Sequence, residues 1–179
     1  DHQLERLFAD MRDAGLWRDT MVVLTSDHGE SLTEHDYLFQ HGEYLYEPSV
    51  KVPLIIKLPG RAMGGRRVQT SVQLIDVAPT ILEAAGLPEP TFVNGVQQSP
   101  MEGTSMVYSF NDAEAPEQHD LQYFEMFCNR GIYHKGWSAV TKHRTPWEMV
   151  AQDLPAFDDD VWELYDGNVD WSRATDLSK

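Results

Sequence analysis

Side chains of the types that bind cations and transfer protons follow an apolar run near the start of the sequence. Asp27-His28-Gly29-Glu30 comes directly after the run Met21–Thr25, and His35 and His41 follow a few residues later. A carboxylate next to an imidazole suits a divalent cation of several identities. In the alternative interpretation Asp27 caps a loop and His28 is a surface residue, and on this pair alone the alternative is preferred.

The elements around this cluster predict where it lies. Apolar residues at helical spacing predict a helix over residues 2–15, with Gly15 ending it. Thr20–Thr25 reads as a buried strand of the parallel-sheet kind, a polar loop follows to Pro48, and Val52–Leu58 reads as a second buried strand. Ligands of open α/β sheets bind beyond the carboxyl ends of the strands, which is where Asp27 and His28 are expected.

The remaining sequence indicates two different parts. The run from Ser71 to Leu87 predicts a short entry and a helix, with Asp76 helping to start it and Gly86 ending it. After about residue 90 the sequence turns to proline-containing loops and short alternating runs, with a hairpin turn expected at His134–Gly136. We therefore expect an α/β part over residues 1–90 and an antiparallel β subdomain over residues 91–179.

Composition excludes some functions and leaves others open. The formal net charge of -15 disfavours a nucleic-acid partner. No apolar run approaches the roughly 18 residues of a membrane helix, so no membrane partner is expected. Cys128 is the single cysteine, which excludes an internal disulfide and a cysteine-rich metal site. Neither the compartment (cytoplasm or periplasm) nor the oligomeric state follows from the sequence.

The first residues indicate a piece of a longer protein. The sequence starts at Asp1, inside the pattern of a helix, without an initiator methionine. We expect a fragment that corresponds to the C-terminal portion of its parent.

Several separate motifs, in one order, carry a family resemblance. "TMVVLTSDHGESLTEH", "HGEYLYEPSVKVPLIIKLPG" and "VQLIDVAPTILEAAGLP" resemble the second half of the sulfatases, which belong to the alkaline-phosphatase-like superfamily. "FEMFCNRGIYHKGWSAVTKH" and "WELYD" resemble the closing segments of bacterial arylsulfatases. The resemblance implies an α/β fold, the C-terminal part of an alkaline-phosphatase-like fold with a small antiparallel β subdomain. It implies hydrolysis of a small-molecule sulfate ester to an alcohol or phenol and sulfate.

The resemblance also implies roles for particular residues. Asp27 and His28 match two ligands of the divalent metal, which is calcium in most sulfatases and magnesium in some. His41 matches the Lys or His that contacts the sulfate or protonates the leaving alcohol. His35 matches a position of mainly structural importance in the loop.

Two parts of a sulfatase site are not in this sequence. The Cys/Ser-x-Pro-x-Arg signature that yields the formylglycine nucleophile does not occur, and Cys128 lacks both the Pro and the Arg at the required offsets. The N-terminal aspartate pair that completes the metal site is also absent. We therefore expect formylglycine in the missing N-terminal part of the parent. We expect the isolated chain to bind metal weakly or not at all and to be inactive.

The missing nucleophile keeps two alternatives open. One is a phosphonate monoester or phosphodiester hydrolase of the same superfamily. The other is a non-catalytic module derived from such an enzyme.

Overall fold

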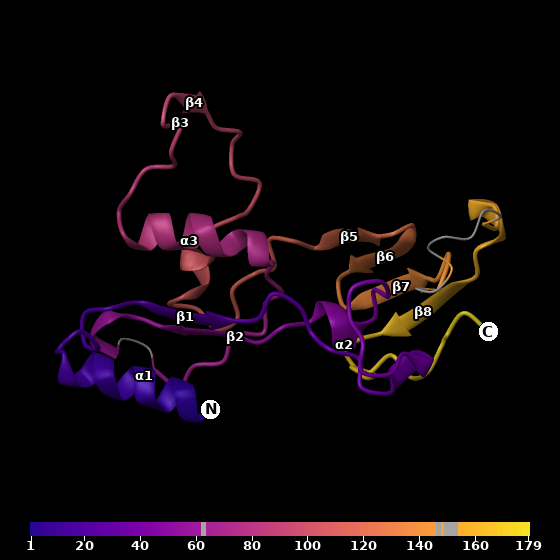
Figure 1. The fold of residues 1–179 in the computed structure, drawn as a ribbon, viewed down its shortest axis with the longest axis horizontal. Coiled ribbons are helices and arrows are strands. Elements are labelled where there is room, and N and C mark those ends of the chain that lie inside the picture. The colour runs from indigo at the N-terminus through magenta and orange to yellow at the C-terminus, as the bar shows by residue number, and fades with distance from the viewer. Residues whose placement is uncertain (62–63, 146–147, 149–153) are drawn as a thin grey trace. The chain divides into compact units, whose positions relative to one another are not determined.

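The computed structural model describes residues 1–179 except 62–63, 146–147 and 149–153. The chain forms two compact units, each built from two segments (Figure 1). Unit 1 comprises Asp1–Thr25 and Leu54–His119, and unit 2 comprises Ser26–Pro53 and Asp120–Lys179. The division near residue 90 that the sequence indicates stays a prediction about domain organisation.

Unit 1 begins with the expected helix and contains both expected strands. Helix α1 (His2–Asp13) is followed by β1 (Val22–Thr25), which pairs with β2 (Leu54–Lys57). The expectation of a parallel sheet is wrong for this pair, because the two strands are antiparallel, with Val23 opposite Ile56. The connection from β1 to β2 contains no crossover helix of the length that a parallel pair requires, only short helical turns.

The rest of unit 1 is built around a short helix. The turns η2 (Pro59–Arg61) and η3 (Leu74–Asp76) precede helix α3 (Val77–Ala84), which ends before Gly86 at φ 67° as expected. A small hairpin of β3 (Phe92–Val93) and β4 (Val96–Gln97) and the turn η4 (Met106–Ser109) follow.

Asp76 organises the start of α3. The Asp76 side chain is 1% exposed, and its carboxylate accepts hydrogen bonds from the backbone N–H groups of Gln73 (2.8 Å) and Thr104 (2.7 Å) and from Nε2 of His119 (2.9 Å). This arrangement joins the entry to α3 with two later segments of the unit. Asp76 is the N-cap residue of α3, as expected, but its side chain completes a capping box on the preceding turn η3 and does not cap α3 itself.

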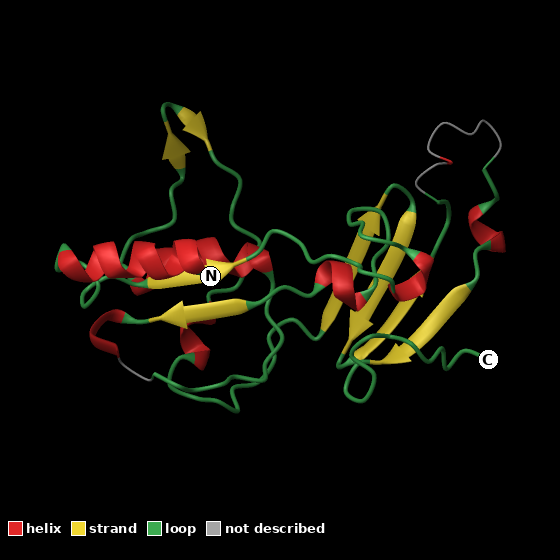
Figure 2. Cartoon of the chain, turned by 60° about the horizontal axis from the view of Figure 1, so that its bottom comes forward, coloured by secondary structure: helices red, strands yellow, loops and turns green. Residues whose placement is uncertain are grey.

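Unit 2 contains an antiparallel meander of four strands (Figure 2). The strands are β5 (Leu121–Met126), β6 (Asn129–His134), β7 (Trp137–Thr141) and β8 (Trp162–Asp166). The expected hairpin turn between β6 and β7 is confirmed, because Lys135 and Gly136 both take positive φ, at 48° and 88°. The expected fold class, α/β with an antiparallel subdomain, therefore agrees with the structure.

One face of the meander packs against the segment Ser26–Pro53. This segment contains the turn η1 (Glu34–Asp36) and the single helical turn α2 (Glu47–Val50), and the turn η6 (Phe157–Asp159) precedes β8. The unit's buried cluster draws on both parts of its sequence and consists of Tyr37, Tyr44, Leu45, Tyr46, Val140 and Tyr165. A Cβ atom on Gly131 would lie 3.3 Å from Cβ of Leu45, so the absence of a side chain there allows close packing.

A buried arginine ties three segments of unit 2 together. The Arg173 guanidinium is 4% exposed and donates to the Leu45 carbonyl (2.8 Å), to Oε2 of Glu47 (2.8 Å) and to Oγ of Ser138 (2.9 Å). Burial lowers the pKa of Arg173, and the Glu47 carboxylate opposes that shift. The C-terminal segment thereby holds α2 and the loop before it against β7.

Candidate functional site

The turn that follows β1 is fixed by short-range hydrogen bonds. Oγ of Ser26 donates to the His28 carbonyl (2.7 Å), and Oδ1 of Asp27 accepts from the His28 backbone N–H (3.1 Å). The Gly29 N–H donates to the Ser49 carbonyl (2.9 Å), and a Cβ atom on Gly29 would lie 2.0 Å from the Pro48 carbonyl oxygen. Only glycine allows this close contact with α2, which sets the direction of the chain after His28.

Asp27 and His28, the two expected metal ligands, lie next to one another at the end of β1. Oδ2 of Asp27 is 3.7 Å from Nε2 of His28, and the Asp27 side chain is 87% exposed. Hydrogen bonds from the backbone N–H groups of Asp27 and His28 lower the pKa of the Asp27 carboxyl, with a smaller contribution from the His28 ring. Asp27 is therefore ionised at neutral pH, the form in which a carboxylate binds a cation.

The tautomer of His28 follows from its contact with the backbone. Nδ1 of His28 lies 2.7 Å from the Gly29 carbonyl oxygen. Because a carbonyl oxygen only accepts, Nδ1 carries a proton, and in the neutral ring Nε2 carries the lone pair. A backbone carbonyl commonly orients a metal-binding histidine in this way, so the donor chemistry of Asp27 and His28 fits two ligands of a divalent cation.

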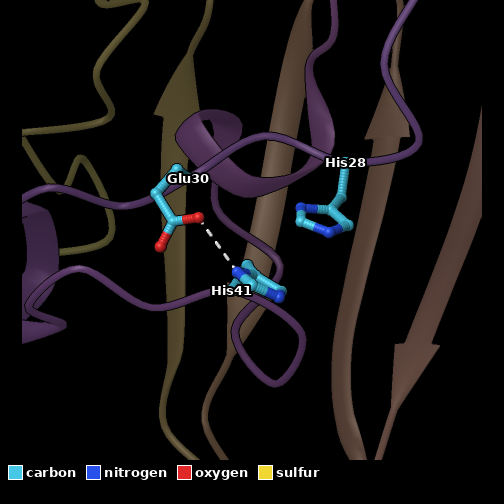
Figure 3. A group of neighbouring side chains, drawn as sticks. All are labelled: His28, Glu30 and His41. Atoms are coloured by element: carbon cyan, nitrogen blue, oxygen red, sulfur yellow. Dashed lines mark hydrogen bonds and ion pairs between the residues drawn. The ribbon is translucent and has the colours of Figure 1, made fainter.

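His41 is brought to this place by an isolated β-bridge. Ser31 and Gln40 exchange two backbone hydrogen bonds, of 3.0 Å and 3.2 Å. Their neighbours Glu30 and His41 therefore lie side by side, with Nδ1 of His41 3.0 Å from Oε2 of Glu30 (Figure 3). The His41 ring also stacks on the His28 ring, with the centroids 3.9 Å apart and an interplanar angle of 18°.

The structure thus adds Glu30 to the residues that the sequence singled out. One ligand atom each of His28, Glu30 and His41 lies within 4.8 Å of the other two. The sequence offered one signal for Glu30, its position in the Asp-His-Gly-Glu run. The pairing of Ser31 with Gln40, which places Glu30 beside His41, has no recognisable sequence pattern.

His35 has the contacts of a structural residue. Its ring stacks on Tyr46, with the centroids 3.5 Å apart, and its Nε2 lies 3.4 Å from the Ser172 carbonyl. Burial lowers the pKa of His35, so the ring is neutral at physiological pH. These contacts fit the loop role that the sequence analysis expects.

Several other basic residues and the single cysteine are engaged elsewhere. Nζ of Lys57 donates to backbone carbonyls, including that of Thr20 (2.7 Å), and Arg66 donates to the Phe110 carbonyl (2.7 Å). Arg130 forms an ion pair with the buried Asp160. Cys128 is partly buried in the tight turn between β5 and β6, as expected for a thiol outside the site.

The structure contains no helix, within its described residues, that is long and apolar enough to span a membrane.

Comparison with known proteins relates this chain to sulfatases. The sulfatase family model matches residues 1–87 of this chain. Arylsulfatase K of Homo sapiens is 34% identical over 151 residues, which cover 84% of this chain and 26% of that protein. Sulfatases generally use a divalent metal ion and a formylglycine residue.

Other relatives extend the comparison. Arylsulfatase K of Xenopus laevis is 38% identical over 101 residues, which cover 56% of this chain and 18% of that protein. The multifunctional alkaline phosphatase superfamily protein PehA of Trinickia caryophylli is 40% identical over 96 residues, or 53% of this chain and 18% of that protein. The chain thus spans about a quarter or less of the length of these relatives.

Solved structures share the fold. BT4656, in complex with its substrate D-glucosamine-2-N,6-O-disulfate, matches with a TM-score of 0.67 at 22% identity, over 98% of this chain and 33% of that chain. The putative sulfatase yidJ of Bacteroides fragilis matches with a TM-score of 0.66 at 18% identity, over 99% of this chain and 35% of that chain. The chain therefore has the C-terminal part of the sulfatase fold.

Proposed function

We propose that this chain is part of a sulfuric ester hydrolase that converts a small-molecule sulfate ester and water to an alcohol or phenol and inorganic sulfate. The observation that carries the proposal is the position of His28 after β1, where it lies beside Asp27 and its ring stacks on that of His41. The match of the sulfatase family model to residues 1–87 supports the same reaction class.

Asp27 and His28 would hold the divalent metal ion, which we propose to be calcium, with magnesium as the alternative. When bound, the ion supplies positive charge that orients the sulfate oxygens and stabilises the charge that develops on them. Calcium takes about six to eight oxygen ligands, so most of its ligands would come from residues outside this chain.

His41 would act on the leaving group. A protonated imidazole can act as a general acid, so His41 would give its proton to the oxygen of the departing alcohol. With Nδ1 directed at Glu30, the outward nitrogen for this transfer is Nε2. Glu30 is then a positioning residue, which holds the ring of His41 in one orientation.

The nucleophile would come from a part of the parent protein that this chain does not include. The formylglycine signature does not occur in the sequence, and Cys128 lies in a turn of unit 2. We therefore expect the 179-residue chain alone to give no turnover of sulfate esters.

An Asp27→Ala substitution in the longer parent protein tests the proposal. Hydrolysis of an aryl sulfate should fall by about 1,000-fold, which corresponds to the several kcal/mol that metal-ion catalysis supplies. The matched control is Asp19→Ala, because Asp19 is an exposed aspartate of unit 1. Equal activities of the two variants would favour the non-catalytic module.

A second candidate reaction is hydrolysis of a phosphonate monoester or phosphodiester. Similarity to PehA, a multifunctional member of the alkaline phosphatase superfamily, is the observation that favours it. Rates of the parent protein on matched aryl sulfate and aryl phosphonate esters decide between the two. A higher kcat/KM for the phosphonate would replace the sulfatase assignment.

A further inference from the structure

The turn between β3 and β4 consists of an asparagine followed by a glycine. Asn94 and Gly95 take φ values of 50° and 82°, the left-handed backbone that both central residues of a type I′ hairpin turn need. They connect two short strands that face one another through two residue pairs, one of which is Val93 and Val96. The residue types that suit this turn also bring an amide side chain next to the least hindered backbone nitrogen that a chain can offer.

An asparagine in this position can react with the peptide group that follows it. The backbone nitrogen of Gly95, deprotonated by hydroxide, attacks Cγ of Asn94, and the new C–N bond closes a cyclic imide. The side-chain nitrogen takes up a proton and leaves as ammonia, so hydroxide acts as a catalyst and is not consumed. Water then opens the imide at either of its carbonyl carbons, which leaves aspartate or isoaspartate at position 94. No group is oxidised or reduced in these steps.

The surroundings of Gly95 leave its nitrogen open to this reaction. A Cβ atom placed on Gly95 would have no atom of the described residues within 4 Å apart from its chain neighbours, so nothing crowds the turn. Residues 91–97 are all exposed, and Figure 1 shows the hairpin at the tip of a loop that rises from α3. A hairpin of two strands is at best marginally stable in water, so it opens at a low cost in free energy. The turn therefore reaches the conformations that imide closure requires without unfolding of unit 1.

The other three asparagines of the chain lack one or both of these conditions. Asn111, Asn129 and Asn168 are followed by Asp, Arg and Val, whose side chains hinder attack by the backbone nitrogen. Asn129 is also 1% exposed, and its Oδ1 accepts a hydrogen bond of 2.8 Å from the backbone N–H of His143. Nδ2 of Asn168 donates to Oδ1 of Asp166 (3.0 Å), which restrains that side chain.

We propose that Asn94 is a site of spontaneous deamidation, with isoaspartate and aspartate as its products. The two products differ in their effect on the hairpin. Asp-Gly also suits a type I′ turn, so aspartate keeps the turn and adds one negative charge. Isoaspartate inserts a methylene carbon into the backbone, which lengthens the turn and disrupts the pairing of Val93 with Val96. The inference concerns the hairpin alone and does not depend on the proposed hydrolysis.

Incubation of the 179-residue chain at mildly alkaline pH, followed by peptide mass spectrometry, tests the inference. The peptide that contains position 94 should gain the mass of one deamidation, at a rate within about tenfold of that of the free peptide Thr91–Gln97, because the hairpin opens readily. The rate should rise with pH, since the deprotonated nitrogen is the attacking group. In NMR spectra, the incubated chain should acquire a second set of signals for Val93 and Val96.

Controls within the same chain separate this site from general deamidation. Asn111 and Asn168 are exposed but not followed by glycine, and they should react at least about tenfold more slowly than Asn94. Asn94→Gln retains an amide but places it one methylene farther from the backbone, which requires a larger ring, and it should slow the mass gain by at least about tenfold. Circular dichroism of the variant verifies that it is folded.

Two results would overturn the inference. One is an unchanged mass at position 94 after a period in which the free peptide has reacted completely. The other is a rate at position 94 equal to that in folded Asn94→Gln or to that of Asn111. Either result leaves the Asp27→Ala activity test of the parent enzyme unaffected, so the two proposals fail separately.

Discussion

The carboxylate of Glu30 and Nδ1 of His41 lie 3.0 Å apart, on residues that flank the Ser31–Gln40 bridge. This contact fixes which nitrogen of His41 faces outward. It also makes the orientation of a proposed proton donor depend on a residue that need not touch the substrate.

Replacing Glu30 with Ala in the parent enzyme should lower kcat about 10- to 100-fold with little change in KM, since orienting partners act on this scale. Glu30→Gln keeps an acceptor for Nδ1–H and should restore most of kcat. The exposed Glu114→Gln is the control, with unchanged kinetics expected. Equal losses in Glu30→Gln and Glu30→Ala would contradict the positioning role.

Asp76 should be indispensable to unit 1. Asp76→Ala removes the acceptor for two backbone N–H groups and for His119 and should cost about 3–5 kcal/mol in unfolding free energy. Urea denaturation measures this difference. The exposed Asp19→Ala should stay within about 0.5 kcal/mol of wild type. A loss of less than about 1 kcal/mol for Asp76→Ala would mean that these contacts add little.

Arg173 should be as important to the stability of unit 2 as Asp76 is to that of unit 1. Arg173→Met leaves the Glu47 carboxylate and the Leu45 carbonyl without their buried donor, and we expect a loss of about 3–5 kcal/mol. Arg173→Lys should recover only part of the lost stability, because an ammonium group cannot reproduce the planar arrangement of donors. Thermal unfolding of both variants, with Arg18→Met as the exposed control, gives the comparison. If Arg173→Met is as stable as wild type, Arg173 does not hold α2 against β7.

The free energy of unfolding should decrease as the pH is lowered, partly because of His35. Burial lowers the folded-state pKa of His35 below the ordinary value for histidine, so the unfolded chain binds the proton first as the pH falls. The contribution of the neutral ring to stability is fully present above the pKa that His35 has in the unfolded chain. It is lost as the pH falls through the pKa of His35 in the folded chain. His35→Phe keeps an aromatic ring for Tyr46 and removes this titration.

The measurement for His35 is the unfolding free energy at several values between about pH 7.5 and pH 5. The decrease toward low pH should be less steep in His35→Phe than in wild type. The exposed His134→Phe should keep the wild-type slope. A wild-type slope in His35→Phe would show that other groups control this range.

Local patterns in the sequence predicted the elements well. Leu4, Leu7 and Phe8 at helical spacing indicated α1, and Lys135-Gly136 between alternating runs indicated the β6–β7 hairpin. Both signals depend on contacts between residues close in sequence. The direction of the β1–β2 pair was mispredicted, because continuous apolar runs are typical of buried parallel strands, whereas these two strands are partly exposed and antiparallel.

These local patterns could not predict contacts between residues that are far apart in the sequence. Glu30 meets His41 only because the loop closes through the Ser31–Gln40 bridge. Arg173 reaches Leu45 and Ser138 from the far end of the sequence. Such contacts depend on the tertiary fold, which composition and spacing do not specify.

The interleaving of the two units limits how this protein can be divided or recombined. The chain passes from one unit to the other after Thr25, after Pro53 and after His119. A single crossover with a related gene anywhere in residues 26–119 would therefore build at least one unit from segments of two different parent proteins. Exchange of the segment that carries His28, Glu30 and His41 would require two coordinated junctions, together with a meander that accepts the incoming loop.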